Sequence, residues 1–276
     1  MTQGKSTTWF ALRRPPAAEL SIAGRAYRLT KVFKHDFFAA TCLYAAAAPT
    51  GDLDELVVKF YRTQRVGILP MGWHGRHSRN HERAVYRRLE GIPGIPRYAG
   101  DVGDNGAAIE FIHALPIDHG QSIPPGFFDR LRGLFDAVHA RGVAYVDANK
   151  RSNILLDESG GCWLIDFQIS IIGPDWPWPA GAISRSVVRY FQGKDLYHLY
   201  KHKRRLAGAE LTEEEREISL HRTGLHALHR WLTKPYRAIR RRFLGDKYRQ
   251  GKLVSPTSQL EDHYQPEKET WRGKKP

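Results

Sequence analysis

The chain has 276 residues, of which 41% are hydrophobic, and a formal net charge of +14 with a pI of about 9.9. This length and composition exclude a disordered chain and allow a large core in one domain or two lobes, and the basic balance favours acidic partners. The two cysteines, Cys42 and Cys162, exclude a disulfide framework and favour a reducing cytoplasm.

The N-terminal part of the chain predicts an arm followed by strands. Residues 1–20 lack the apolar core of a signal peptide and indicate a flexible arm. The β-branched and aromatic residues of 27–44 predict two strands with a turn near Asp36. Residues 56–61 predict a compact strand in which Lys59 is the one charged residue.

The next segments predict two helices with a pair of strands between them. Apolar residues at helical spacing predict a helix over 78–89, and Glu82 is its only acidic residue. Residues 97–101 and 107–112 predict two strands joined by an Asp-Asn-Gly turn. An amphipathic pattern over 125–141 predicts a helix that packs on the core.

An apolar hairpin follows and carries polar residues at its ends. The runs 153–156 and 162–165 flank a glycine-containing turn and predict two antiparallel strands. Asn153 and Asp166 stand at the open end of this hairpin, and the loop before it can place Asp147 beside them. Two carboxylates and an amide then converge, which is the oxygen-rich arrangement that a magnesium-bound phosphate needs.

The segment after the hairpin contains several prolines. Residues 170–192 therefore indicate a short loop, in which Trp176 and Trp178 either pack the loop or line an acceptor site. Residues 193–229 predict two helices, the second of which begins with a capping box at Thr212.

The C-terminal part of the chain is strongly basic. Arg230–Lys252 holds nine lysines or arginines and one acid, interleaved with aromatic and aliphatic residues. This pattern is typical of a segment that lies on an anionic membrane surface, and the alternative is a solvated helix on the larger lobe. Residues 255–276 predict a disordered polar tail.

The order of these residues resembles a known family. Asp147, Asn153 and the Asp-Phe-Gln segment 166–168 resemble the catalytic loop and the Asp-Phe-Gly segment of the protein-kinase-like fold. The strand that holds Lys59 resembles the Val-Ala-Ile-Lys strand of kinases. The resemblance covers about residues 25–195, and it implies a bilobal α+β fold with a small β-rich N-lobe and a larger helical C-lobe.

The resemblance also implies a chemistry and assigns roles to single residues. It implies ATP and Mg²⁺ as cofactors and transfer of the γ-phosphate to a hydroxyl. The implied roles are catalytic for Asp147 and Lys150, cofactor-binding for Lys59, Glu82, Glu110, Phe111 and Ile112, and metal-binding for Asn153 and Asp166.

The chain also departs from the common kinase pattern. No Gly-rich loop precedes Lys59, and Tyr145-Val146 replace the usual His-Arg pair. Asp147 and Asn153 are six positions apart, one more than usual, and Gln168 replaces a glycine. These departures make the chain more similar to bacterial lipopolysaccharide core (heptose or Kdo) kinases and to RIO-type atypical kinases.

We therefore expect an ATP-dependent kinase that phosphorylates a lipopolysaccharide core sugar. It would be cytoplasmic or peripheral on the inner membrane, with a lipid-linked sugar or a protein as acceptor. The alternatives are a RIO-like serine/threonine kinase or RNA-associated factor, and a pseudokinase scaffold that binds nucleotide. The expected divisions are an arm at 1–20, an N-lobe at 21–112, a C-lobe at 113–254 and a tail at 255–276.

Overall fold

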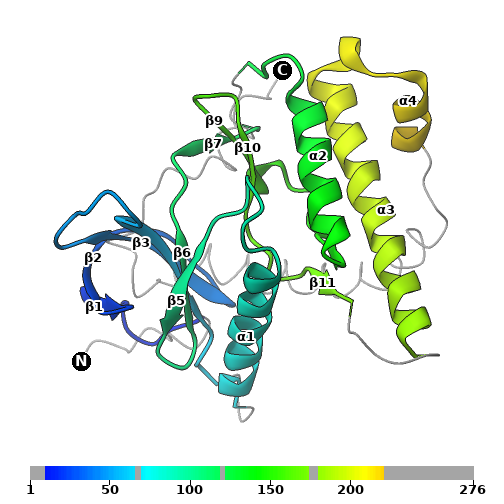
Figure 1. Ribbon diagram of the computed structural model, residues 1–276. Coiled ribbons are helices and arrows are strands. Elements are labelled where there is room, and N and C mark those ends of the chain that lie inside the picture. Colours follow the sequence, from blue (N-terminus) through cyan, green and yellow to red (C-terminus); the bar gives the residue numbers. More distant parts are fainter. Residues whose placement is uncertain (1–9, 66–69, 119–121, 174–179, 221–276) are drawn as a thin grey trace, which may run out of the picture. The chain divides into compact units, whose positions relative to one another are not determined.

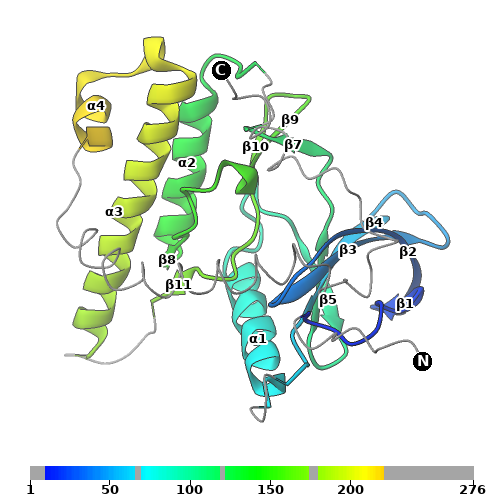
Figure 2. The ribbon, with the colours of Figure 1, turned by 180° about the vertical axis from the view of Figure 1, so that it is seen from behind.

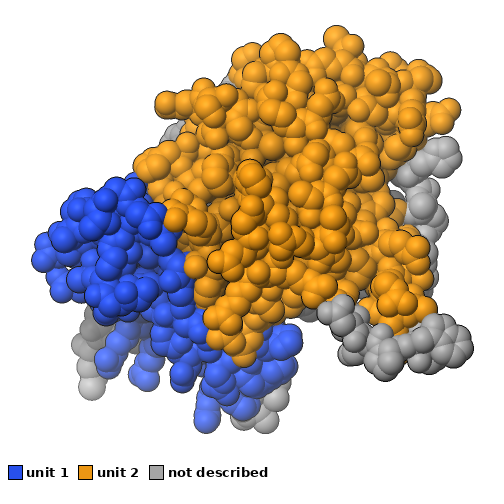
Figure 3. All heavy atoms as spheres, viewed as in Figure 1, with its two compact units in different colours: residues 1–79, 99–108, 222–262 blue, residues 80–98, 109–221, 263–276 orange. Residues whose placement is uncertain are grey.

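The described part of the chain forms two compact units. The computed structural model describes residues 10–65, 70–118, 122–173 and 180–220. Within these ranges, unit 1 comprises residues 10–65, 70–79 and 99–108, and unit 2 comprises residues 80–98, 109–118, 122–173 and 180–220 (Figure 3). The boundaries expected from the sequence at residues 20, 112 and 254 stay predictions.

The first four strands belong to unit 1 and are part of a curled six-stranded sheet (Figure 1). The strand order is β1-β2-β3-β4-β6-β5, and neighbours from β1 to β4 are antiparallel. The strands are β1 (Glu19–Ile22), β2 (Arg25–His35), β3 (Ala39–Ala46), β4 (Glu55–Tyr61), β5 (Tyr98–Val102) and β6 (Gly106–Glu110). The strands expected from the sequence in this region are thus confirmed.

The alternation of residues along β4 explains how unit 1 builds its core. Leu56, Val58 and Phe60 lie on one face of the strand and join the buried cluster that Tyr27, Val32, Cys42 and Tyr44 also form. Lys59 falls between these residues in the period-two pattern, so its side chain leaves the strand on the opposite face. Lys59 is 9% exposed.

The turn between β2 and β3 contains no glycine, and the side chain of Asp36 stabilises it. The Asp36 carboxylate accepts hydrogen bonds from the amides of Phe38 and Ala39, at 2.8 and 3.0 Å, and the Asp36 amide donates to the Ala39 carbonyl. Burial raises the pKa of Asp36, but the neighbouring Lys34 and the two amides lower it by more, so the net shift of the pKa is downward. Two of the turn amides are therefore already engaged.

A buried arginine ties the chain segments around this turn together. The guanidinium of Arg62, which is 1% exposed, donates to the carbonyls of Phe10, Phe37, Gln64 and Arg65. It also lies 4.0 Å from the centre of the Phe37 ring. These contacts satisfy a charged group that burial would otherwise destabilise.

Unit 2 contains most of the helices and the predicted hairpin (Figure 2). Strands β9 (Ile154–Asp157) and β10 (Cys162–Leu164) pair antiparallel, as the sequence predicted, and β7 (Ala114–Pro116) adds to β9. A second small ladder joins β8 (Val143–Ala144) to β11 (Ile171–Ile172). The helices are α2 (Phe127–Ala140), α3 (Ala180–Leu206), α4 (Glu213–Leu220) and the second half of α1 (Gly72–Arg88), with short 3₁₀ turns at Arg151–Asn153 and Gly208–Glu210.

The prediction of a loop over residues 170–192 is wrong for its second half. Helix α3 begins at Ala180 and continues without interruption through residue 193, where the sequence indicated a helix start. The last proline of the segment is Pro179, so nothing beyond it removes a helix hydrogen bond. The capping box of α4 is confirmed, since Thr212 and Glu215 exchange side-chain to backbone hydrogen bonds.

Two glycines with similar backbone conformations offer a matched test of packing in unit 2. Gly94 (φ +90°) and Gly91 (φ +83°) both adopt left-handed conformations. A Cβ on Gly94 would lie 2.5 Å from the Cys162 carbonyl oxygen and 2.8 Å from a methyl group of Leu134, whereas a Cβ on Gly91 would meet nothing within 4 Å.

We expect Gly91→Ala to cost about 1–2 kcal/mol of unfolding free energy, because only the backbone is strained. Gly94→Ala should cost about 1–3 kcal/mol more, because β10 and α2 must also shift. Denaturant unfolding of the two variants measures the difference. Equal losses would contradict the close approach of Gly94 to β10.

Candidate functional site

The loop that precedes the hairpin brings three of the predicted residues together. Asp147 is buried, and its Oδ2 atom accepts hydrogen bonds from Lys150 Nζ at 2.6 Å and from Asn153 Nδ2 at 2.9 Å. Both donors reach the same oxygen. In the described residues no hydrogen bond reaches the other oxygen, Oδ1, so this atom can accept a proton from a further group.

Asp166 follows the second strand of the hairpin, and its negative charge affects Asp147. The Ile165 amide donates to the Asn153 carbonyl at 3.1 Å, which joins the two ends of the hairpin. Burial raises the pKa of Asp147, Lys150 opposes this shift, and the Asp166 carboxylate adds to it. Asp166 also adopts a left-handed conformation (φ +63°), which is rare for a residue other than glycine.

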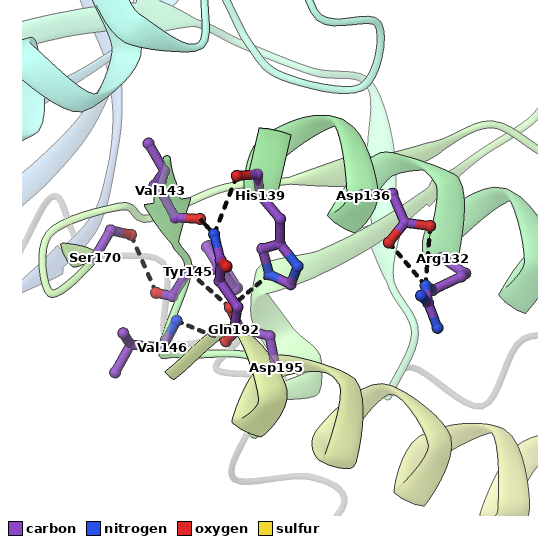
Figure 4. A network of polar contacts seen from close by, with 9 residues as sticks. All are labelled: Arg132, Asp136, His139, Val143, Tyr145, Val146, Ser170, Gln192 and Asp195. Carbon is purple, nitrogen blue, oxygen red and sulfur yellow. Dashed lines mark hydrogen bonds and ion pairs between the residues drawn. The ribbon is translucent and has the colours of Figure 1, made fainter. Parts of the chain in front are cut away.

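A carboxylate from α3 holds the backbone of this loop (Figure 4). Asp195 is fully buried, and its two oxygens accept hydrogen bonds from the amides of Tyr145, at 2.8 Å, and Val146, at 2.7 Å. His139 Nε2 lies 3.0 Å from the same carboxylate. Burial raises the pKa of Asp195, while His139 and the two amides lower it. Asp195 therefore fixes the backbone directly before Asp147.

The residue before Asp147 is held in a strained conformation by this anchor. Val146 has a φ of +70°, although its branched side chain disfavours the left-handed region. Such a conformation persists only where the surroundings determine it, and here the bond to Asp195 does so. The strain fixes the direction in which the next side chain, Asp147, leaves the backbone.

Aromatic rings support the same loop from within unit 2. Tyr145 contacts Phe135 on one side and Phe167 on the other, with ring centres 5.9 and 5.1 Å apart. Phe167 in turn contacts Tyr86 of α1 at 5.2 Å. The Tyr145 hydroxyl donates to the Ile165 carbonyl, next to Asp166. Tyr145 therefore couples the loop to the Asp-Phe-Gln segment.

The sequence pattern predicted no role for Asp195 or Tyr145. Asp195 does carry a sequence signal, because it is the only acidic residue in the 27 residues of α3. Tyr145 was noted only as a replacement for a histidine. The Ser170 hydroxyl donates to the Tyr145 carbonyl, and the Tyr145 ring contacts other rings. These are tertiary contacts that local spacing does not reveal.

The nucleotide-binding residues expected from the sequence are divided between the units. Lys59 is buried in unit 1 and Glu82 is fully buried in unit 2, and the pairing expected between them stays a prediction. In unit 2 the Glu110 carboxylate accepts three hydrogen bonds from Arg97, and the Phe111 ring meets the His113 ring edge to face. The carbonyl of Ile112, which is buried, accepts a hydrogen bond from the Ala114 amide.

The expected metal ligands are an amide and a carboxylate, from Asn153 and Asp166. Within the described ranges, no group of three or more His, Cys, Asp or Glu residues could hold a metal ion. Magnesium nevertheless binds through one or two carboxylates when phosphates supply the remaining oxygens, so this donor set fits an ion that arrives with a nucleotide.

Three expectations lie outside the described residues. They concern the acceptor-lining role of Trp176 and Trp178, the membrane contact of Arg230–Lys252 and the polar tail at 255–276. Within the part of the chain that the structure describes, no helix combines the length and the apolar character that a membrane span requires.

Comparison with known proteins supports the fold. No protein-family model and no curated protein sequence matches the chain. A solved Rio2 kinase from Chaetomium thermophilum, in complex with ADP/Mg²⁺-phosphoaspartate, matches 72% of this chain and 61% of its own chain, with 17% identity and a TM-score of 0.50. A second structure of that kinase matches 68% of this chain and 58% of its own, with 18% identity and a TM-score of 0.48.

The likeness shows the fold alone: the protein has a protein-kinase-like fold, as the sequence predicted. The match spans about 61% of the length of the Rio2 structure. The finer resemblance to lipopolysaccharide core kinases stays a prediction.

The anchor formed by Asp195 generates a testable prediction. Asp195→Ala leaves two buried amides without an acceptor, and each such group costs about 1–3 kcal/mol. We therefore expect a loss of about 3 kcal/mol or more in unfolding free energy and faster hydrogen exchange at the amides of Tyr145 and Val146.

The matched control is Asp136→Ala, which removes the exposed carboxylate that pairs with Arg132 in the same unit (Figure 4). Exposed pairs contribute about 0–1 kcal/mol. A similar small loss in both variants would show that Asp195 does not hold the loop.

Proposed function

We propose that the protein transfers the γ-phosphate of ATP to a hydroxyl group in a magnesium-dependent reaction. The observation that carries the proposal is the state of Asp147. Lys150 and Asn153 both bind its Oδ2 atom, so Oδ1 is the oxygen available to an acceptor hydroxyl. The raised pKa that burial gives this carboxyl also makes it a better proton acceptor than an exposed aspartate.

The residues around Asp147 have roles that suit their chemistry. Asp147 orients the acceptor hydroxyl and takes its proton as the new phosphorus–oxygen bond forms, while the bond from the γ-phosphorus to the bridging oxygen breaks and ADP leaves. Lys150 stabilises negative charge on the transferred phosphoryl group beside Asp147. Asn153 and Asp166 would hold Mg²⁺, which supplies charge neutralisation to the nucleotide phosphates when it is bound.

Nucleotide binding is proposed for residues of both units. Lys59 would bind the α- and β-phosphates, with Glu82 as its partner, and the backbone of 110–112 would meet the adenine. The Rio2 kinase with the same fold was solved with ADP and Mg²⁺, which supports ATP and Mg²⁺ as the cofactors here. Because Asp36 engages two amides of the β2–β3 turn, the phosphates would depend on side chains more than in kinases with a Gly-rich loop.

The acceptor is proposed only as a class of hydroxyl compound. A lipopolysaccharide core sugar is the acceptor that the sequence resemblance suggests. The alternative is a RIO-like serine/threonine kinase or an RNA-associated factor, and the fold shared with the Rio2 kinase supports the RIO-like kinase. The closed β2–β3 turn also suits the further alternative, a nucleotide-binding pseudokinase. Measuring magnesium-dependent ATP turnover separates the enzyme from the pseudokinase.

The catalytic assignment predicts distinct effects for two aspartates. Asp166→Ala should abolish magnesium-dependent phosphoryl transfer, because the carboxylate ligand is lost. Asp147→Asn should leave ATP binding nearly unchanged and lower turnover by about 10²-fold or more, because the proton acceptor is lost. Glu158→Gln, an exposed change in the same hairpin, is the control and should retain full turnover. Full turnover in Asp147→Asn would exclude the assignment.

The proposed pairing of Lys59 with Glu82 predicts non-additive kinetics. Lys59→Ala should lower kcat/KM for ATP, and Glu82→Gln should lower it less. The double variant should be no worse than Lys59→Ala, because residues in one network do not contribute independently. Steady-state kinetics on the three variants decides the matter, and fully additive losses would assign Glu82 to packing alone.

A further inference from the structure

Positively charged side chains gather around the segment that follows Asp147. Lys201 of α3 donates from Nζ to the side-chain oxygen of Asn149 at 3.2 Å. Arg205 lies one helical turn after Lys201, so the two side chains leave the same face of α3. Arg151 belongs to the loop itself. These three residues, Arg151, Lys201 and Arg205, are called the cation cluster below.

A buried histidine on α3, next to Lys201, contacts the same loop. His202 is 2% exposed, and its Nε2 atom lies 2.9 Å from the Ala148 carbonyl oxygen. Because a carbonyl only accepts, Nε2 carries the proton, and Nδ1 is a buried atom without a hydrogen-bond partner in the described residues. The pKa of His202 is lowered to about 4, chiefly by burial; the Ala148 bond opposes this shift, and the three charges of the cation cluster add to it.

Lys203 of α3 is compensated by carboxylates, whereas the two arginines of the cation cluster are not paired with any in the described residues. Lys203, two positions after Lys201, binds the carboxylates of Asp129 and Glu215. Within the described residues, no carboxylate pairs with Arg151 or Arg205. The neighbouring carboxylate, Asp147, is already bound by Lys150. Neighbouring like charges repel one another, and a bound anion would reduce that repulsion.

We propose that the cation cluster is a binding site for a phosphate group that the acceptor itself carries. A phosphate monoester offers three oxygens and about two negative charges, and arginine side chains bind such groups through paired N–H donors. The acceptor hydroxyl would then lie between this phosphate and Asp147. The acceptor role rests on the proposed phosphoryl transfer, whereas phosphate binding by the cluster does not.

The test is a titration of the full chain with inorganic phosphate, followed by NMR at the amides of 148–151. The unchanged protein should show saturable shifts at these amides. Arg205→Glu should weaken phosphate binding by about tenfold or more, because one charge-assisted contact is lost and a repulsive charge is gained. Arg189→Glu makes the same charge change on an exposed residue of α3 and is the matched control.

Two probe pairs identify the source of the phosphate. They are glucose 6-phosphate with glucose, and a phosphoserine peptide with its unphosphorylated form. The phosphorylated member of at least one pair should bind more tightly by about tenfold in the unchanged protein and in Arg189→Glu, but not in Arg205→Glu. No phosphate-dependent shift at 148–151, or an equal loss in both charge variants, would overturn the proposal.

The two proposals fail separately. Thermal unfolding of each variant shows whether it is folded, and both changed residues are exposed, so folding should be retained. Absence of magnesium-dependent ATP turnover would refute the phosphotransferase assignment and leave the phosphate titration unaffected. Turnover without phosphate binding at 148–151 would refute the acceptor site and leave the enzyme assignment in place.

Discussion

The hydrogen bonds from two backbone amides to the buried carboxylate of Asp195 determine the rest of the candidate site. They hold Val146 in a conformation that its side chain disfavours, and that conformation sets the direction of Asp147. The cost of burying the Asp195 charge is offset because both of its oxygens accept bonds from N–H donors. A long helix thus supplies the reference point for a short loop, which has too few internal contacts to hold its own geometry.

Local patterns in the sequence predicted a large part of the fold. The two apolar runs around a glycine-containing turn became β9 and β10, and the alternation of LVVKFY became β4 with Lys59 opposite Val58 and Phe60. The proximity of Asp147 to Asn153 also followed from the sequence, because both residues are tied to one hairpin. These features depend on contacts between residues that are close in the chain.

The features that sequence analysis missed depend on distant residues. Asp195 reaches Tyr145 across 50 positions; it is the only acidic residue of α3, but the local pattern does not show which distant backbone it binds. The start of α3 was missed because prolines up to Pro179 hid a segment compatible with a helix. The closure of the β2–β3 turn by Asp36 was also missed, since an Asx-type turn replaced the glycines that the family pattern led us to expect.

The buried guanidinium of Arg62 constrains the order in which unit 1 can form. Its partner Phe10 lies 52 positions earlier in the chain, so this contact closes a far longer loop than the hairpins between β2, β3 and β4. Closing a long loop costs more entropy and comes after local pairing in time. During synthesis Phe10 leaves the ribosome well before Arg62 exists. The segment around Phe10 can therefore bond to the β2–β3 turn early, through Ala11 and Asp36, but its contact with Arg62 forms only after β4 is complete.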